Sequence, residues 1–206
     1  MGSKTKLIIF DLDGVLINSK TNMRFAWLAV LKKFKLNISF NRYFNYIGIP
    51  FEKILSKFDI NLKYHKKIKD TFSKASLKNV NKINLYPNVC KIINVLKKKN
   101  IKLSIVTSKD KFRSKRIIKK FKIDIKQIFS PEKKLRGKPY PDQLIKCLKI
   151  NKTKPKNAIY IGDTKYDFIA AKKAKIKFVH ASYGYGKYLK IYKSKINNLS
   201  ELKNII

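Results

Sequence analysis

The sequence predicts an α/β protein built on a parallel sheet, with a block of helices inserted after the first strand. Short apolar segments alternate with helical stretches from residue 83 onward, a pattern typical of parallel strands joined by crossover helices. Residues 20–82, in contrast, contain no convincing strand. A length of 206 residues suits one α/β domain with a modest insertion.

Four segments are the clearest strand candidates, and a fifth is a candidate for a short strand. They are rich in β-branched and aromatic residues and are bounded by charged or turn-forming residues. The four cover residues 7–10 (LIIF), 102–108 (KLSIVTS), 157–163 (NAIYIGD) and 177–182 (KFVHAS), and the fifth covers 127–130 (QIFS).

Helices are predicted between these strands from apolar residues at helical spacing. Val89, Ile92 and Leu96 recur on one face of the segment NVCKIINVLKKKN. The segments at 142–150 (DQLIKCLKI) and 166–174 (YDFIAAKKA) are predicted as two further helices.

Residues 18–82 are predicted to form a separate helical module, because the segment is too long for a plain loop. Met23 and Trp27 begin a series that lines one face of a helix. The segments FEKILSKF and YHKKIKDTF indicate two more helices, after a turn at GIP. We therefore expect a core made of residues 1–17 and 83–206 around this insertion.

Two pairs of carboxylates follow two of the predicted strands. Asp11 and Asp13 come directly after the first strand, in a chain with only 12 acidic residues against 50 basic ones. Asp163 and Asp167 follow the strand AIYIG. Because the carboxyl ends of parallel strands share one edge, the pairs can converge. Carboxylates around one point form an oxygen ligand set for Mg²⁺, and the cation would cancel their repulsion.

Other strand ends supply groups that suit a phosphate. Thr107 and Ser108 end the strand SIVTS, and Lys138 lies in the segment RGKPYPD. Mg²⁺, a lysine, hydroxyl groups and a carboxylate nucleophile together favour phosphoryl transfer. Each feature alone has a simpler explanation, since Thr-Ser after a strand is often a turn or a cap. Asp142, behind Pro141, is expected to start a helix rather than to act in catalysis.

Four segments occur in an order that resembles a known superfamily: DLDGVLINS, VTS, GKPYPD and IGDTKYD. They resemble the four motifs of the haloacid dehalogenase superfamily, and most of all its phosphoglycolate phosphatase-like and β-phosphoglucomutase-like branch. The segments LYPNV and YGYG also match that branch. The resemblance covers nearly the whole chain and implies a Rossmann-like core with an inserted α-helical cap. Residues 18–82 fall where that branch carries its cap, which closes over the site and selects the leaving group.

The resemblance also implies roles for the acidic residues. Asp11 matches the nucleophile, which forms an aspartyl-phosphate. Asp13 matches the general acid/base, which protonates the leaving oxygen and then activates water. Mg²⁺ would be held by Asp11, by the main-chain carbonyl of Asp13 and by Asp163, with Asp167 supporting it directly or through water.

Three further positions match the phosphate-binding part of the family pattern. Thr107 and the backbone at Ser108 would bind the phosphate, and Lys138 would neutralise both the phosphate and the nucleophile. The departures are modest: Ser108 replaces a commoner Asn, and Asn88 replaces a common Gly in the YPGV segment. These departures leave the identity of the substrate open, but they do not affect the expected chemistry.

The expected activity is that of a Mg²⁺-dependent phosphatase acting on a small phosphomonoester. A small phosphorylated metabolite is therefore the expected binding partner. A phosphomutase on a sugar phosphate is an alternative on the same scaffold. A non-catalytic or nucleic-acid-binding protein of this fold is disfavoured, because a binder would have no need of Asp13. A monomer is favoured.

The formal net charge of +38 raises the question of a nucleic-acid partner. Lysine is spread over the chain and accompanied by many Ile and Asn residues, so compositional bias is the favoured explanation and no specific nucleic acid is expected.

Cys90 and Cys147 form no CxxC pair and are expected as reduced thiols. No apolar run reaches the ~18 residues of a membrane span, and LIIF is too short for a signal peptide. The expected location is therefore the cytoplasm, with no membrane partner.

Overall fold

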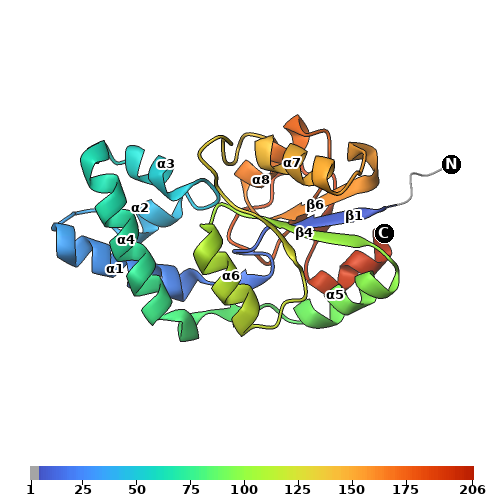
Figure 1. The fold of residues 1–206 in the computed structure, drawn as a ribbon, viewed down its shortest axis with the longest axis horizontal. Coiled ribbons are helices and arrows are strands. Elements are labelled where there is room, and N and C mark those ends of the chain that lie inside the picture. Colours follow the sequence, from blue (N-terminus) through green and yellow to red (C-terminus); the bar gives the residue numbers. More distant parts are fainter. Residues whose placement is uncertain (1–4) are drawn as a thin grey trace.

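A computed structural model describes residues 5–206 and shows a sheet layer with a block of helices at one end (Figure 1). The main sheet has six strands, all parallel, in the order β5-β4-β1-β6-β7-β8. The strands are β1 (Leu7–Phe10), β4 (Lys102–Val106), β5 (Gln127–Phe129), β6 (Ala158–Gly162), β7 (Lys177–Ala181) and β8 (Lys195–Ile196). The α/β class is thus confirmed, and the last strand, β8, was not predicted.

Helices cover both faces of this sheet (Figure 1). On one face lie α5 (Val89–Lys98), α6 (Lys111–Lys120) and the 3-10 helix η3 (Leu199–Asn204), and on the other lie α7 (Asp142–Ile150) and α8 (Lys165–Lys173). Along β1, Ile8 and Phe10 enter one core while Leu7 and Ile9 enter the other. Because both of its faces are buried, the central strand is apolar at every position.

The helical block comprises α1 (Lys20–Phe34), α2 (Phe40–Phe44), α3 (Phe51–Ser56) and α4 (Leu62–Lys78). It has a hydrophobic core of its own, centred on Trp27. The Trp27 ring stacks on Tyr43 with 4.5 Å between ring centroids, and its Nε1 donates to the Ile38 carbonyl at 2.9 Å. Met23 and Trp27 lie on the buried side of α1, as the spacing predicted. The short helix α2 gave too brief a pattern to predict.

A two-stranded antiparallel ribbon joins the helical block to the sheet layer. It pairs β2 (Ile17–Asn18) with β3 (Asn84–Leu85), and the 3-10 helix η1 (Val80–Lys82) precedes β3. Nearby, the Asn22 side chain donates to the carbonyls of Ser76 and Asn79, each at 2.8 Å. The entry to the block and the exit from it are therefore tied together.

The carboxyl ends of the strands face the helical block (Figure 1). Asp11, Thr107 and Asp163 follow β1, β4 and β6, which are neighbours in the sheet. The predicted functional residues therefore meet between the sheet edge and the block. A 3-10 helix, η2 (Pro155–Asn157), leads into β6. Within residues 5–206, no helix combines the length and the apolar character needed to cross a bilayer, and both cysteines are free.

Candidate active site

Three carboxylates converge at the centre of the sheet edge. Asp11, Asp163 and Asp167 are all buried, and one oxygen of each lies within 4.8 Å of the others. The loop after β1 reaches this point through Gly14, whose φ of +86° favours glycine. A Cβ at Gly14 would lie only 2.2 Å from Asp163 Oδ2. The two pairs predicted to converge thus bring three of their four side chains into one cluster.

Lys138 is the cation of this cluster. Its Nζ lies 3.0 Å from Asp11 Oδ1 and 2.7 Å from Asp167 Oδ1. The Tyr160 hydroxyl also donates to Asp167 Oδ1, at 2.6 Å. Burial on its own would lower the pKa of Lys138, but Asp11 and Asp167 outweigh burial and hold this pKa above its usual value. Lys138 therefore remains charged.

The three carboxylates differ electrostatically. Burial raises the pKa of Asp11 to about 7 against the opposing effect of Lys138, and burial also raises the pKa of Asp163. For Asp167 burial acts in the same direction, yet Lys138 and the bound hydroxyls keep its pKa below the usual value. Asp167 therefore stays ionised, whereas burial disfavours the ionised form of Asp11 and Asp163.

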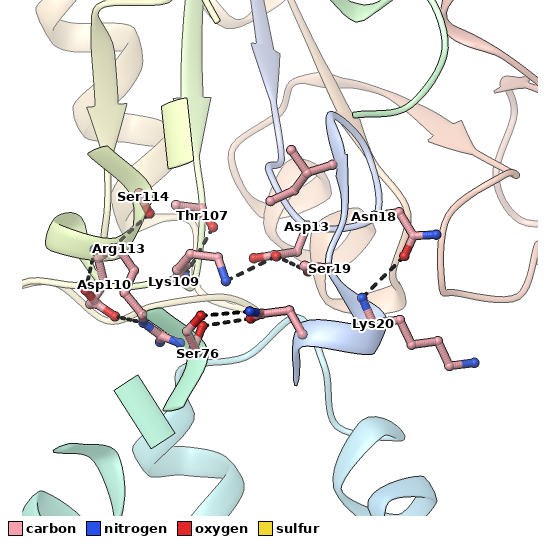
Figure 2. Close-up of polar contacts among 12 residues, drawn as sticks. Asp13, Asn18, Ser19, Lys20, Ser76, Thr107, Lys109, Asp110, Arg113 and Ser114 are labelled. Carbon is pink, nitrogen blue, oxygen red and sulfur yellow. Dashed lines mark hydrogen bonds and ion pairs between the residues drawn. The ribbon is translucent and has the colours of Figure 1, made fainter. Parts of the chain in front are cut away.

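Asp13 lies beside the cluster, and its Oδ1 is held by groups from two other segments (Figure 2). The Ser19 hydroxyl donates to Asp13 Oδ1, and Lys109 Nζ lies 3.2 Å from the same oxygen. Ser19 is also anchored, because its backbone N–H donates to the Tyr185 hydroxyl at 2.6 Å. The Asp13 carboxylate is thus oriented at the point where the sheet edge meets the helical block.

Thr107 and Ser108, two of the three residues predicted to bind phosphate, directly follow β4. Thr107 is buried, and its hydroxyl accepts a hydrogen bond from the Lys109 N–H at 3.1 Å, which leaves the hydroxyl proton free to donate. The Ser108 hydroxyl instead donates to the Gly48 carbonyl at 2.7 Å. The Ser108 side chain is therefore used to hold the loop between α2 and α3.

An open pocket lies between the sheet edge and the helical block. The sheet side supplies its polar wall, which consists of Asp11, Asp13, Thr107, Ser108, Lys109 and Arg113. The block supplies a mainly apolar wall, which includes Met23, Tyr43, Ile49, Phe51, Ile54 and Phe72. The carboxylates and the cations thus lie on the sheet side of the pocket, and most of its apolar groups lie on the block side.

Lys109 and Arg113 were not predicted as site residues. Both are buried, and Figure 2 shows them extending from the segment after β4 toward Asp13 and Ser76. The only local signal is the Asp110–Arg113 spacing, because the Asp110 side chain caps α6 and also binds the Arg113 Nε at 2.5 Å. Among 50 basic residues, no pattern marks which two are buried in the pocket.

Asp142, His65 and His180 lie outside the site. Asp142 is the first residue of α7 and pairs with Arg136, as expected for a residue that starts a helix. His65 contacts the Ile60 carbonyl within the helical block, and His180 lies in β7 against Tyr192. Neither histidine lines the pocket.

Comparison with known proteins places the chain in a family. The model of the haloacid dehalogenase-like hydrolases matches residues 8–181. A phosphoglycolate phosphatase from Aquifex aeolicus is 31% identical over 88% of this chain and 87% of its own length. Pyrophosphatase PpaX from Oceanobacillus iheyensis is 23% identical over 84% of this chain and 81% of its own length.

Solved structures agree with the fold. A predicted phosphoglycolate phosphatase from Haemophilus somnus superposes with a TM-score of 0.84 at 25% identity, covering 98% of this chain and 97% of its own. A haloacid dehalogenase-like hydrolase from Streptococcus pneumoniae superposes with a TM-score of 0.85 at 22% identity, covering 100% and 99%. The chain therefore belongs to the haloacid dehalogenase-like hydrolase family, as a phosphatase of the phosphoglycolate phosphatase-like branch.

Proposed function

We propose that this protein is a Mg²⁺-dependent phosphatase of small phosphate esters and that Asp11 is its nucleophile. The observation that carries the proposal is the buried group of Asp11, Asp163 and Asp167 around Lys138 at the carboxyl edge of the sheet. Attack by Asp11 on phosphorus would form an aspartyl-phosphate and break the bond to the leaving oxygen. Hydrolysis of that intermediate would then release phosphate and restore Asp11.

The residues present suit a magnesium ion. Asp163 Oδ1 is buried and has no hydrogen-bond partner within residues 5–206, and Asp11 Oδ1 has only its ion pair with Lys138. Hard carboxylate oxygens in such a position are the ligands that Mg²⁺ prefers. Asp11, Asp163 and the Asp13 main-chain carbonyl would hold the ion, which would supply positive charge next to the phosphoryl group.

Asp167 would support the magnesium ligands rather than bind the ion directly. Its Oδ1 accepts from Lys138 and Tyr160, and its Oδ2 accepts from the Thr164 N–H at 3.0 Å and from the Thr164 hydroxyl. With all these contacts in place, its main effect is to hold Lys138 close to Asp11. Any contact with the ion would most simply run through water.

Asp13 would move the protons. In the first step it donates a proton to the leaving oxygen, and in the second it takes one from the water that attacks the aspartyl-phosphate. Ser19 and Lys109 hold only Oδ1, so the orientation of the carboxylate is set without occupying both oxygens. Thr107 and the backbone at Ser108 would bind the phosphoryl oxygens, and Lys138 would offset their charge.

Residues 18–82 would act as the cap that selects the leaving group. The block contributes the apolar wall of the pocket, and its loop contacts the sheet side through the hydrogen bond between Ser108 and Gly48. The residues of this wall offer one polar side chain, that of Tyr43. A sugar leaving group, with several hydroxyls to satisfy, fits such a wall poorly, which favours a phosphatase over a sugar phosphomutase.

A panel of phosphorylated metabolites, assayed for phosphate release with and without Mg²⁺, tests the proposal. Phosphoglycolate and inorganic pyrophosphate belong in the panel because relatives are named for these activities. Release that needs Mg²⁺ is expected, and Asp163→Asn should raise the Mg²⁺ concentration for half-maximal activity at least about tenfold. Asp70→Asn, at an exposed carboxylate of α4, is the matched control. Full activity in the presence of a chelator would contradict the metal assignment.

A further inference from the structure

Two buried basic side chains of the pocket, Lys109 and Arg113, carry N–H donors for which residues 5–206 supply no acceptor. Lys109 is 7% exposed and Arg113 is 5% exposed. Lys109 Nζ has one carboxylate neighbour, Asp13 Oδ1 at 3.2 Å. Arg113 donates through Nε to Asp110, and no other side chain or carbonyl within residues 5–206 binds its terminal nitrogens. Both side chains line the pocket, so these donors are available to a negatively charged group of a bound molecule.

The two cations are close enough to repel each other electrostatically. Asp110 is the other nearby acid, and it is already bound to Arg113. In the planar Arg113 side chain, two terminal nitrogens remain in a fork that matches a carboxylate or a phosphate.

Lys109 and Arg113 lie where they would contact the leaving group rather than the transferred phosphoryl group. Lys138 already serves Asp11, whereas Lys109 lies on the Asp13 side of the pocket, where the leaving oxygen would receive its proton. The Arg113 guanidinium also lies 5.2 Å from the centre of the Phe72 ring of α4. The pair therefore borders the apolar wall that the leaving group would contact.

We propose that Lys109 and Arg113 bind a second negatively charged group, carried by the leaving group of the substrate. The enzyme would then favour phosphate esters or anhydrides of small acids over neutral esters of the same size. The apolar wall limits the body of the leaving group to a compact one without several hydroxyls. This inference rests on the proposed function, because the direction of the leaving group depends on Asp11 as nucleophile.

The test compares kcat/KM for substrates that differ in the charge of the leaving group. The leaving group of phosphoglycolate carries a carboxylate, and that of inorganic pyrophosphate is itself a phosphate. Ethyl phosphate, whose leaving group is uncharged, is the comparison of similar size. The wild-type enzyme should prefer at least one charged substrate about tenfold or more, since a charge-assisted hydrogen bond is lost with the neutral ester. The charged substrate whose advantage over ethyl phosphate is lost in the Lys109 and Arg113 variants identifies the group that is bound.

Two variants locate the preference in these residues. Lys109→Met should bring the charged-to-neutral ratio close to one, mainly through a higher KM for the charged substrate. Arg113→Lys keeps the charge but removes the fork, and it should lower the ratio about threefold or more. Lys115→Met and Arg116→Met, at exposed positions of α6, should keep the wild-type ratio.

The ratio separates substrate selection from a general effect on Asp13. If Lys109→Met lowers kcat/KM equally for all three substrates, Lys109 only positions Asp13 and the proposal is wrong. Equal use of charged and neutral esters by the wild-type enzyme would also overturn it, without any variant. No turnover of these substrates or of p-nitrophenyl phosphate with Mg²⁺ would contradict the proposed function itself.

Discussion

The two walls of the pocket are stabilised in different ways. On the sheet side, Asp167 accepts hydrogen bonds at both oxygens, and Lys138 is held between Asp11 and Asp167. On the block side the contacts are mostly between rings and aliphatic chains, as in the stack of Trp27 on Tyr43. A hydrogen-bonded network sets positions closely, whereas apolar packing tolerates changes of shape when volume is kept.

This difference indicates how the work of the enzyme is divided. In the proposed function, the sheet edge would determine which bond is attacked, and the apolar wall of the block would limit the size and shape of the leaving group. Few polar contacts connect the two walls, among them Ser108 to Gly48 and Ser19 to Asp13. Changes on the sheet side should therefore abolish chemistry, and changes in the contacts between the walls should have graded effects.

The largest expected effect is on the sheet side. Asp11→Asn should reduce steady-state phosphate release by at least about 10⁴-fold, because an amide cannot attack phosphorus. The fold should be retained, since the substitution preserves shape and removes a carboxylate that burial disfavours. Phosphate release and a thermal melt check this, with Asp70→Asn as the control. Measurable turnover, once deamidation is excluded by mass spectrometry, would show that Asp11 is not the nucleophile.

Asp13→Asn should cost less and should depend on the leaving group. A general acid contributes ~10²–10⁴-fold, and an alkyl alcohol needs the proton more than p-nitrophenol does. The loss should therefore be large for ethyl phosphate and smaller for p-nitrophenyl phosphate, as measured by kcat/KM for each, because hydrolysis of the aspartyl-phosphate is common to both esters. An equal loss for both esters would show that Asp13 is not the acid.

The acidic cluster should also make stability depend on pH. The folded protein holds a proton on Asp11 up to about pH 7, whereas the unfolded chain releases it near its ordinary pKa of about 4. This contribution is complete below about pH 4 and is lost as pH rises through 7. In a chelator, the melting temperature of wild type relative to Asp11→Asn should fall between pH 5 and 8. Added Mg²⁺ should restore more stability at pH 8 than at pH 5. A relative melting temperature that rises with pH would contradict the assigned electrostatics.

The smallest expected effect concerns the contact between the walls. Ser108→Ala removes the hydrogen bond to Gly48, which lies in the left-handed region at φ +108° and packs against Thr164. One such bond is worth about 0.5–1.5 kcal/mol, so kcat/KM should fall about 2–10-fold. Steady-state kinetics check this, with Ser56→Ala, an exposed serine of α3, as the control. A loss above about a hundredfold would mean that the Ser108 hydroxyl binds the phosphate directly.

Much of the sheet-side wall could be predicted from the sequence. Asp11, Thr107 and Asp163 each follow an apolar run, and parallel strands place their carboxyl ends at one edge. Asp167 was paired with Asp163 after the same strand, whereas Lys138 required the family pattern as well, since a lysine in a loop has no periodicity that marks it. The helical character of residues 20–78 followed from the spacing of residues such as Met23 and Trp27.

The tertiary structure alone decided which further residues reach the pocket. Lys109 and Arg113 are buried because the helical block packs over the start of α6, a contact between segments far apart in the chain. Ser108 contacts Gly48 across 60 positions, and Ser19 contacts Tyr185 across 166. Local patterns record periodicity and strand ends. They do not record which of many similar lysines a distant helix will cover, because that depends on how two separately packed cores meet.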